Sequence, residues 1–248
     1  NKALEIPWSA DRPLPESERE FRKLFWREIV RADHRVAAGM GRRREDAFQQ
    51  IALLRARALS AYVICNDLDP AVVDSLRHDS LIACSDENSS LVATAHDVLE
   101  DWAILHWIEE QHLTAEGSFR ELSGAIGAHP AVRRSYRKWV AELVERDPPA
   151  ADHLFKAAIV ETRISAHFRD DTLVSLLKAP SAPEFLAQHE TGLLANDRVI
   201  LKRVIHLLRV ACVTTPTWLA GAAGHGSIFN VPDGSAWPMV LRLVHRNI

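Results

Sequence analysis

The stretch Ala95-His96-Asp97-Val98-Leu99-Glu100-Asp101-Trp102 opens a strongly apolar helix directly after a short β-like run, Leu91–Thr94. Thr94 and Asp97 form a Thr-x-x-Asp variant of the capping box, so we expect the N-cap of this helix near Thr94 or Ala95. His96 then lies beside the positive end of the helix, where free backbone N–H groups favour anions and phosphates. A plainer interpretation also fits, in which Asp97 only caps the helix and His96 is a half-buried filler.

The residues before this stretch follow a helical pattern. Apolar side chains recur at intervals of three and four from Glu16 to about Ala38 and again from about Glu45 to Val63, which predicts two helices. Pro70 is well placed at the first position of a third helix, which we expect to reach about Arg77.

The pattern then changes to short β-prone runs. Leu81–Cys84 and Leu91–Thr94 flank a polar tip at Asp86–Ser90. Helices followed by strand, tip, strand and a further helix are typical of a winged-helix module with a short β-hairpin, in which the tip is the wing. The fold class that we predict is therefore mainly α, with this module followed by an irregular, repeat-like helical array.

Two features argue against nucleic acid as a partner of the module. The presumptive recognition helix, Ala71–Arg77, carries only one acid and one base. The cluster Arg42–Arg44 has no interleaved aromatic residues, so we interpret it as a solvated helix start.

The remainder of the chain is helical with short connections. Many short antiparallel helices favour an array, although no exact sequence period supports a named repeat class. The exception is Thr214–Pro238, a Gly-, Pro- and Ser-rich loop of the kind that often carries function. We expect helices at about residues 115–126, 130–146, 150–168, 171–178, 183–190, 194–212 and 236–247.

Three parts are thus predicted: an irregular N-terminal segment (1–15), a linker helix with the winged-helix module (16–112), and the helical array (113–248). The chain lacks an initiator Met and ends within an apparent helix, so we expect a piece of a longer polypeptide.

Composition narrows the functional classes. Thirty Lys and Arg against 33 Asp and Glu give a net charge of -3, which provides no overall attraction to nucleic acid or membranes. Three cysteines without a Cys-x-x-Cys pair do not fit a disulfide framework or a thiolate zinc site, so we expect a reducing cytoplasm. No apolar run reaches the ~18 residues that a membrane span needs.

The common signatures of enzymes are missing from the sequence. There is no phosphate loop, Gly-x-Ser-x-Gly elbow or His-Glu-x-x-His motif. Glu109-x-x-His112 matches only half of a di-iron site, so we interpret it as an exposed helix end. His153 and His167 fall on one predicted helix, too far apart to share a metal. An enzyme centred on His225 stays possible only if an acid or nucleophile converges on that loop.

The stretch from about Arg42 to His112 resembles the winged-helix segment of STAND-type NTPases, the signalling ATPases that include NACHT and NB-ARC proteins. Two motifs carry the resemblance. Leu76-Arg77-His78-Asp79-Ser80-Leu81-Ile82 is similar to the Leu-x-x-Asp-x-Leu/Ile ending of a short helix, and Ala95–Ala103 is similar to the His-Asp motif of bacterial members, including antiviral defence proteins.

The resemblance implies a site shared with another domain. His96 would contact the β-phosphate of ADP in an upstream nucleotide-binding domain, and Asp97 would support the local geometry. ATP exchange would release the winged helix from its resting packing. ADP or ATP, with magnesium, would be held mainly outside this chain, which alone is not expected to hydrolyse ATP.

The function implied is that of a regulatory, sensor-proximal part of a signalling ATPase, in antiviral defence. Its helical array would contact a protein trigger or other protomers, and the parent would form a homo-oligomer on activation. The alternative is a helical protein-interaction scaffold with no nucleotide role.

Overall fold

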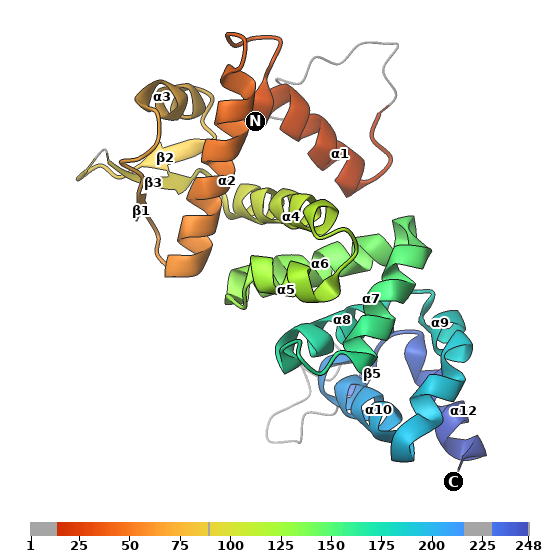
Figure 1. The fold of residues 1–248 in the computed structure, drawn as a ribbon. Coiled ribbons are helices and arrows are strands. Elements are labelled where there is room, and N and C mark those ends of the chain that lie inside the picture. The colour runs from red at the N-terminus through yellow and green to blue at the C-terminus, as the bar shows by residue number, and fades with distance from the viewer. Residues whose placement is uncertain (1–13, 89, 216–229, 248) are drawn as a thin grey trace. The chain divides into compact units, whose positions relative to one another are not determined.

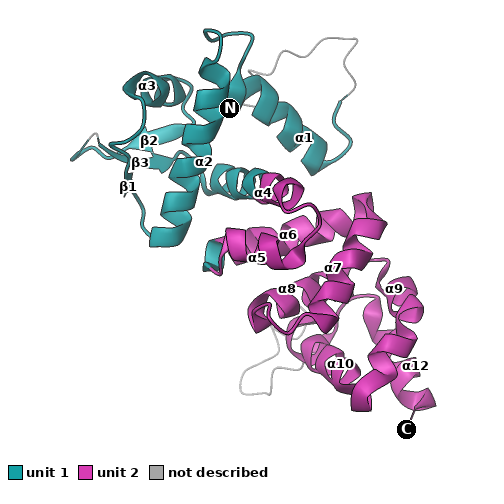
Figure 2. Cartoon of the chain, in the orientation of Figure 1, with its two compact units in different colours: residues 1–107, 129–131 teal, residues 108–128, 132–248 magenta. Residues whose placement is uncertain are grey.

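The computed structural model describes residues 14–88, 90–215 and 230–247 (Figure 1). It is mainly helical with a small antiparallel sheet, which confirms the predicted fold class. The chain divides into two compact units, residues 1–107 with 129–131 and residues 108–128 with 132–248 (Figure 2). In the described ranges, no helix is both long and apolar enough to cross a membrane.

The first unit is a set of helices around a three-stranded sheet. Its helical elements are α1 (Glu18–Phe25), the π-helical segment η2 (Trp26–Arg31), α2 (Met40–Ala58), α3 (Pro70–His78) and most of α4 (Asp97–Thr114). Its strands are β1 (Val63–Ile64), β2 (Ile82–Cys84) and β3 (Leu91–Thr94).

The sheet has the antiparallel order β1-β3-β2. Ile82 pairs with Thr94, so the β2–β3 hairpin forms where the sequence predicts it. The sequence does not predict β1, because its apolar pattern favours a helix through Val63. The structure ends α2 at Ala58, where Leu59 takes a left-handed conformation with φ 51° that a helix cannot continue. Between β1 and β2 lies α3, which begins at Pro70 as predicted.

The first predicted helix is shorter than the sequence suggested. It ends at Arg31 instead of about Ala38, because Ala32 turns left-handed with φ 51° and its N–H donates to the Arg27 carbonyl at 3.1 Å. This wide i→i+5 turn closes a π-helical segment, a form that is frequently associated with functional sites.

Arg44 corrects the interpretation of Arg42–Arg44 as a solvated cluster. Arg42 and Arg43 are exposed, but the Arg44 side chain is only 1% exposed. Its guanidinium donates to the Val30 carbonyl at 2.8 Å and the Ile29 carbonyl at 2.9 Å, both at the end of η2, and to Asp79 at 2.6 Å. Arg44 therefore satisfies orphan carbonyls of the π-helical turn, which explains its burial.

The second unit is an array of short helices. It contains α5 (Phe119–Ile126), α6 (Pro130–Arg146), α7 (Pro148–Val160), α8 (Ala166–Lys178), α9 (Ala182–Gln188), α10 (Glu190–Ala211) and α12 (Ala236–Arg246). A two-stranded ladder joins β4 (Val213–Thr214), at the start of the predicted Thr214–Pro238 loop, to β5 (Val231–Pro232), which lies within that predicted loop. His225 lies outside the described residues.

Two expectations for this unit are wrong. Residues 150–168 are two helices, since α7 ends at Val160 and α8 begins at Ala166, so His153 and His167 do not share a helix. Glu109 and His112 are not an exposed helix end. Glu109 accepts hydrogen bonds from Trp139 and Arg146, each at 2.6 Å, and the His112 ring contacts Trp139 with centroids 4.9 Å apart. Burial lowers the pKa of His112.

The core of the array is aromatic and contains a buried polar network. Tyr136 packs against Phe119, Trp139 and Phe168, and its hydroxyl hydrogen-bonds Thr172 at 2.7 Å. Trp139 is 2% exposed, so it belongs to this core.

Candidate functional site at the start of α4

The turn between β3 and α4 presents His96 to solvent. The His96 carbonyl accepts hydrogen bonds from the N–H groups of Leu99 at 3.0 Å and Glu100 at 3.3 Å, so this residue immediately precedes the helix. Its side chain is exposed, not half-buried as in the plainer interpretation. The imidazole therefore lies at the positive end of α4, as the sequence predicts, and is accessible to an external group.

The predicted capping box does not form. Thr94 belongs to β3, where it pairs with Ile82, and its hydroxyl accepts a hydrogen bond from Arg55 of α2. The Ala95 N–H donates to the Leu81 carbonyl at 2.9 Å, which extends the strand pairing by one residue. The helix consequently begins later than expected, and His96 occupies the cap position.

Asp97 is the first residue of α4 and is almost fully exposed, at 94% of its side-chain surface. Its carboxylate lies 3.8 Å from Arg55, at the outer limit of an ion pair. An acid in the first helical turn suits the helix dipole. Because the pair with Arg55 is long and exposed on the Asp97 side, it contributes little to holding the turn.

Arg55 is the residue that sequence reasoning missed. Its side chain is only 14% exposed and lies 2.8 Å from the carboxylate of Glu100, which is 12% exposed. Because it also donates to Thr94, Arg55 contacts the chain on both sides of His96. One cation thus ties β3 to the first turn of α4. No signal in the sequence singled it out from the other arginines of α2.

Aromatic packing anchors the next turn of α4. Trp102 is 8% exposed and meets Phe25 edge-on with centroids 5.4 Å apart, and it also contacts Phe21 of α1. Trp102 is therefore a core residue of the first unit. Trp107 is half-buried instead, with the Arg57 guanidinium 5.8 Å from its ring centroid.

A second polar cluster lies farther along α4. His106 stacks on Trp26 with centroids 4.5 Å apart, and both rings hydrogen-bond Oε1 of Glu45, at 3.0 and 2.6 Å. Burial alone would raise the pKa of Glu45, but the hydrogen bonds from His106 and Trp26 and the charges of His106 and Arg31 outweigh it and lower the pKa. The cluster joins η2, α2 and α4 through one ionised carboxylate.

The two clusters differ in what they can do. The ring of His106 and the carboxylate of Glu45 already bond one another, so that pair is suited to holding elements together. His96 has its ring in solvent beside a helix N-terminus, an arrangement that suits contact with an anion. No family model and no curated protein matches this chain.

Proposed function

We propose that this chain is the regulatory, sensor-proximal part of a STAND-type signalling ATPase, and that it relays nucleotide state between an ADP-bound resting form and an ATP-bound active form. The observation that carries the proposal is the exposed imidazole of His96 at the first turn of α4. Such a group donates to a phosphate that the helix end also attracts.

The side chains around His96 connect its turn to the rest of the first unit, so a phosphate contact at His96 would affect that unit. Arg55 bonds Thr94 before it and pairs with Glu100 after it. Trp102, one turn farther on, packs on α1. A phosphate bound by His96 therefore contacts a turn that side-chain interactions hold on both sides. The role of supporting the turn, which the resemblance gives to Asp97, falls mainly to Arg55 and Glu100 in this proposal. Arg55 lies 2.8 Å from Glu100 but 3.8 Å from Asp97.

The nucleotide itself belongs to a neighbouring domain under this proposal. That upstream domain supplies the phosphate loop and the acid that binds magnesium, and His96 completes the resting site from outside. The helical array receives a protein trigger or another protomer, and the parent oligomerises when ATP replaces ADP. We place this activity in the cytoplasm, in antiviral defence.

The test is His96→Ala in the full-length parent protein. The ADP that co-purifies with the protein is quantified by chromatography after denaturation, and signalling output is measured without trigger. We expect less retained ADP and a higher basal output in the variant.

His78→Ala is the matched control. His78 is also an exposed histidine of the first unit, but it occupies the last turn of α3, where the helix dipole has the opposite sign. The control should behave as wild type. If His96→Ala leaves both ADP content and output unchanged, the nucleotide role is refuted, and the helical scaffold becomes the better description.

A further inference from the structure

Charged residues are distributed unevenly along this chain. Residues 58–119 contain twelve Asp and Glu but one arginine, Arg77, whereas residues 198–247 contain six Lys and Arg but one acid, Asp233. Most of the acidic segment lies in the first unit, and the basic segment lies in the second. The net charge of -3 therefore hides two regions of opposite sign, each able to attract a partner of the other sign.

The basic segment includes the second part of α10, in which polar and apolar side chains separate cleanly. Its buried side consists of aliphatic residues: Leu201, Val204, Leu207 and Leu208. Lys202, His206 and Arg209 are all exposed, and their spacing of four and three residues places them along one side of the helix. We call these three residues the basic face of α10.

The basic face has no acidic neighbour within the described residues. Lys202, His206 and Arg209 form no ion pair there, whereas Arg203 of the same helix donates to Asp170 of α8 at 2.9 Å. The neighbouring helix α12 packs on α10 and adds further exposed cations, Arg242 and Arg246. The positive charge of this face is therefore available to a partner.

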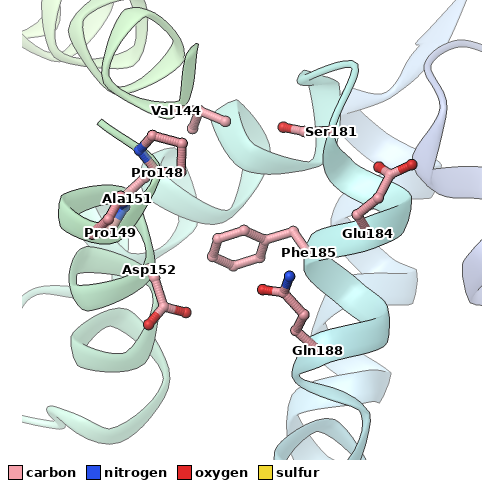
Figure 3. A pocket seen from close by; sticks show the side chains of 9 residues that line it. All are labelled: Val144, Pro148, Pro149, Ala151, Asp152, Ser181, Glu184, Phe185 and Gln188. Carbon is pink, nitrogen blue, oxygen red and sulfur yellow. The ribbon is translucent and has the colours of Figure 1, made fainter. Parts of the chain in front are cut away.

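The acids around the pocket between α7 and α9 have a different arrangement. Figure 3 shows Asp152 and Glu184 on either side of Phe185, so their carboxylates do not converge on one point. Asp152 is held by Lys156 at 2.6 Å and by His189 at 2.5 Å. This pocket presents no charged site comparable to the basic face of α10.

The acidic segment places exposed carboxylates at one end of the sheet in the first unit. Ile64 of β1 pairs with Leu91 of β3, and the N–H of Ser85, directly after β2, donates to the Leu91 carbonyl at 2.9 Å. The chain segments that follow β1 and β2 therefore leave the sheet at the same end. These segments carry three exposed acids, which we call the acidic end of the sheet: Asp67, Asp86 and Glu87.

The acidic end also lacks a partner within the described residues. Asp69, two positions after Asp67, pairs with Arg43 at 2.8 Å. Asp67, Asp86 and Glu87 form no ion pair in that part of the chain. Their negative charge is thus as available as the positive charge of the basic face.

Both surfaces carry exposed aliphatic side chains as well. Val199 and Val210 lie on the same side of α10 as the basic face and are 57% and 66% exposed. Ile64, at the acidic end of the sheet, is 60% exposed. Burial of these side chains in a contact adds hydrophobic stabilisation to the attraction between charges. The two surfaces therefore match in charge and in apolar content.

We propose that the basic face of α10 in one copy of this chain binds the acidic end of the sheet in a second copy. Clustered acids that complement the basic face occur on this same chain, and α10 contains no Phe, Tyr or Trp on which nucleic-acid bases could stack. Because the two surfaces differ, the contact is heterologous, and its repetition builds rings or open chains. The inference rests on the proposed function for the association of protomers, and it assigns the surfaces that meet.

The test is sedimentation equilibrium of the full chain at neutral pH over a range of protein concentrations. At a salt concentration of about 0.01 M, where charges act over about 30 Å, the weight-average mass should rise with protein concentration. At about 1 M salt, where that range falls to about 3 Å, the mass should stay near the 27.8 kDa of one chain.

Two double variants reverse the charge of one surface each. Lys202→Glu/Arg209→Glu and Asp86→Lys/Glu87→Lys should each weaken self-association at least about tenfold at low salt, because like charges then face one another. The first variant is acidic at both surfaces and the second is basic at both. An equimolar mixture of the two should therefore associate again.

Arg120→Glu/Arg163→Glu is the matched control. Both arginines are exposed in the second unit, outside α10, and the variant has the same net charge as Lys202→Glu/Arg209→Glu. The control should self-associate as wild type does.

His96→Ala should also self-associate as wild type does, so failure of this contact is separable from failure of the nucleotide contact. The proposal is overturned if the wild-type chain stays monomeric at low salt. It is also overturned if Lys202→Glu/Arg209→Glu associates no more weakly than the control, or if the mixture of the two charge-reversed variants stays monomeric.

Discussion

Replacing Arg55 with methionine tests whether one buried cation holds the turn that carries His96. Methionine keeps much of the apolar stem but removes the guanidinium. The variant loses the bond to Thr94 and the 2.8 Å pair with Glu100, and it leaves that carboxylate, 12% exposed, without its guanidinium.

The expected cost follows from burial. Breaking a fully buried ion pair costs about 3–5 kcal/mol, because the remaining charge stays desolvated. Solvent reaches 14% of the Arg55 side chain and 12% of that of Glu100. The carboxylate therefore recovers some hydration after the change. We expect a loss of about 2 kcal/mol in the stability of the first unit.

Amide hydrogen exchange is the suitable assay, because it reports the β3–α4 segment separately from the second unit. Amides of Ala95, Leu99 and Glu100 should exchange about thirtyfold faster in the variant, which corresponds to about 2 kcal/mol. Arg42→Met is the control on the same helix. Arg42 is 68% exposed and pairs with the exposed Asp46 at 3.4 Å, so its change should cost less than about 0.5 kcal/mol. Equal exchange in the two variants would refute the claim that Arg55 holds the turn between β3 and α4.

Three further changes test the packing around the site and the array. Arg44→Met should lower the free energy of unfolding by about 3 kcal/mol in urea denaturation, because two carbonyls lose their donor and Asp79 keeps Arg35, 3.6 Å away, in place of its nearer partner; a loss below about 1 kcal/mol would contradict this. Glu45→Gln should destabilise most above the ordinary pKa of Glu45, 4.5. The difference should shrink as the pH falls through its lowered folded pKa, and urea midpoints with a pH-independent difference would argue against an ionised Glu45. Tyr136→Phe should cost about 1 kcal/mol through the lost bond to Thr172, and an unchanged midpoint would count against that bond.

Local signals in the sequence located several elements well. Pro70 after Asp69 marked the start of α3, and the Asp69 side chain accepts from the Ala71 N–H at 2.9 Å as a cap does. The short β-prone run Leu91–Thr94, directly after the polar tip, marked β3. These features depend on neighbouring residues alone, so the sequence predicts them without any knowledge of tertiary contacts.

The errors arose where distant residues decide the outcome. Arg44 is buried because it reaches carbonyls of η2, 14 and 15 residues earlier in the chain, a contact that local patterning cannot reveal. Thr94 does not cap α4, because its backbone pairs with Ile82 in the sheet and its hydroxyl accepts a hydrogen bond from Arg55. The same reason hid Arg55, whose partners lie 39 and 45 positions away, in β3 and α4 respectively.

The most direct measurement of the central claim is the rate at which ADP leaves the full-length parent. Fluorescently labelled ADP is bound and then chased with excess unlabelled ADP, in wild type and in the His96→Ala and His78→Ala variants. The loss of one charged hydrogen bond to a phosphate predicts release about ten- to hundredfold faster from His96→Ala alone. Equal release from all three proteins would contradict a nucleotide contact by His96.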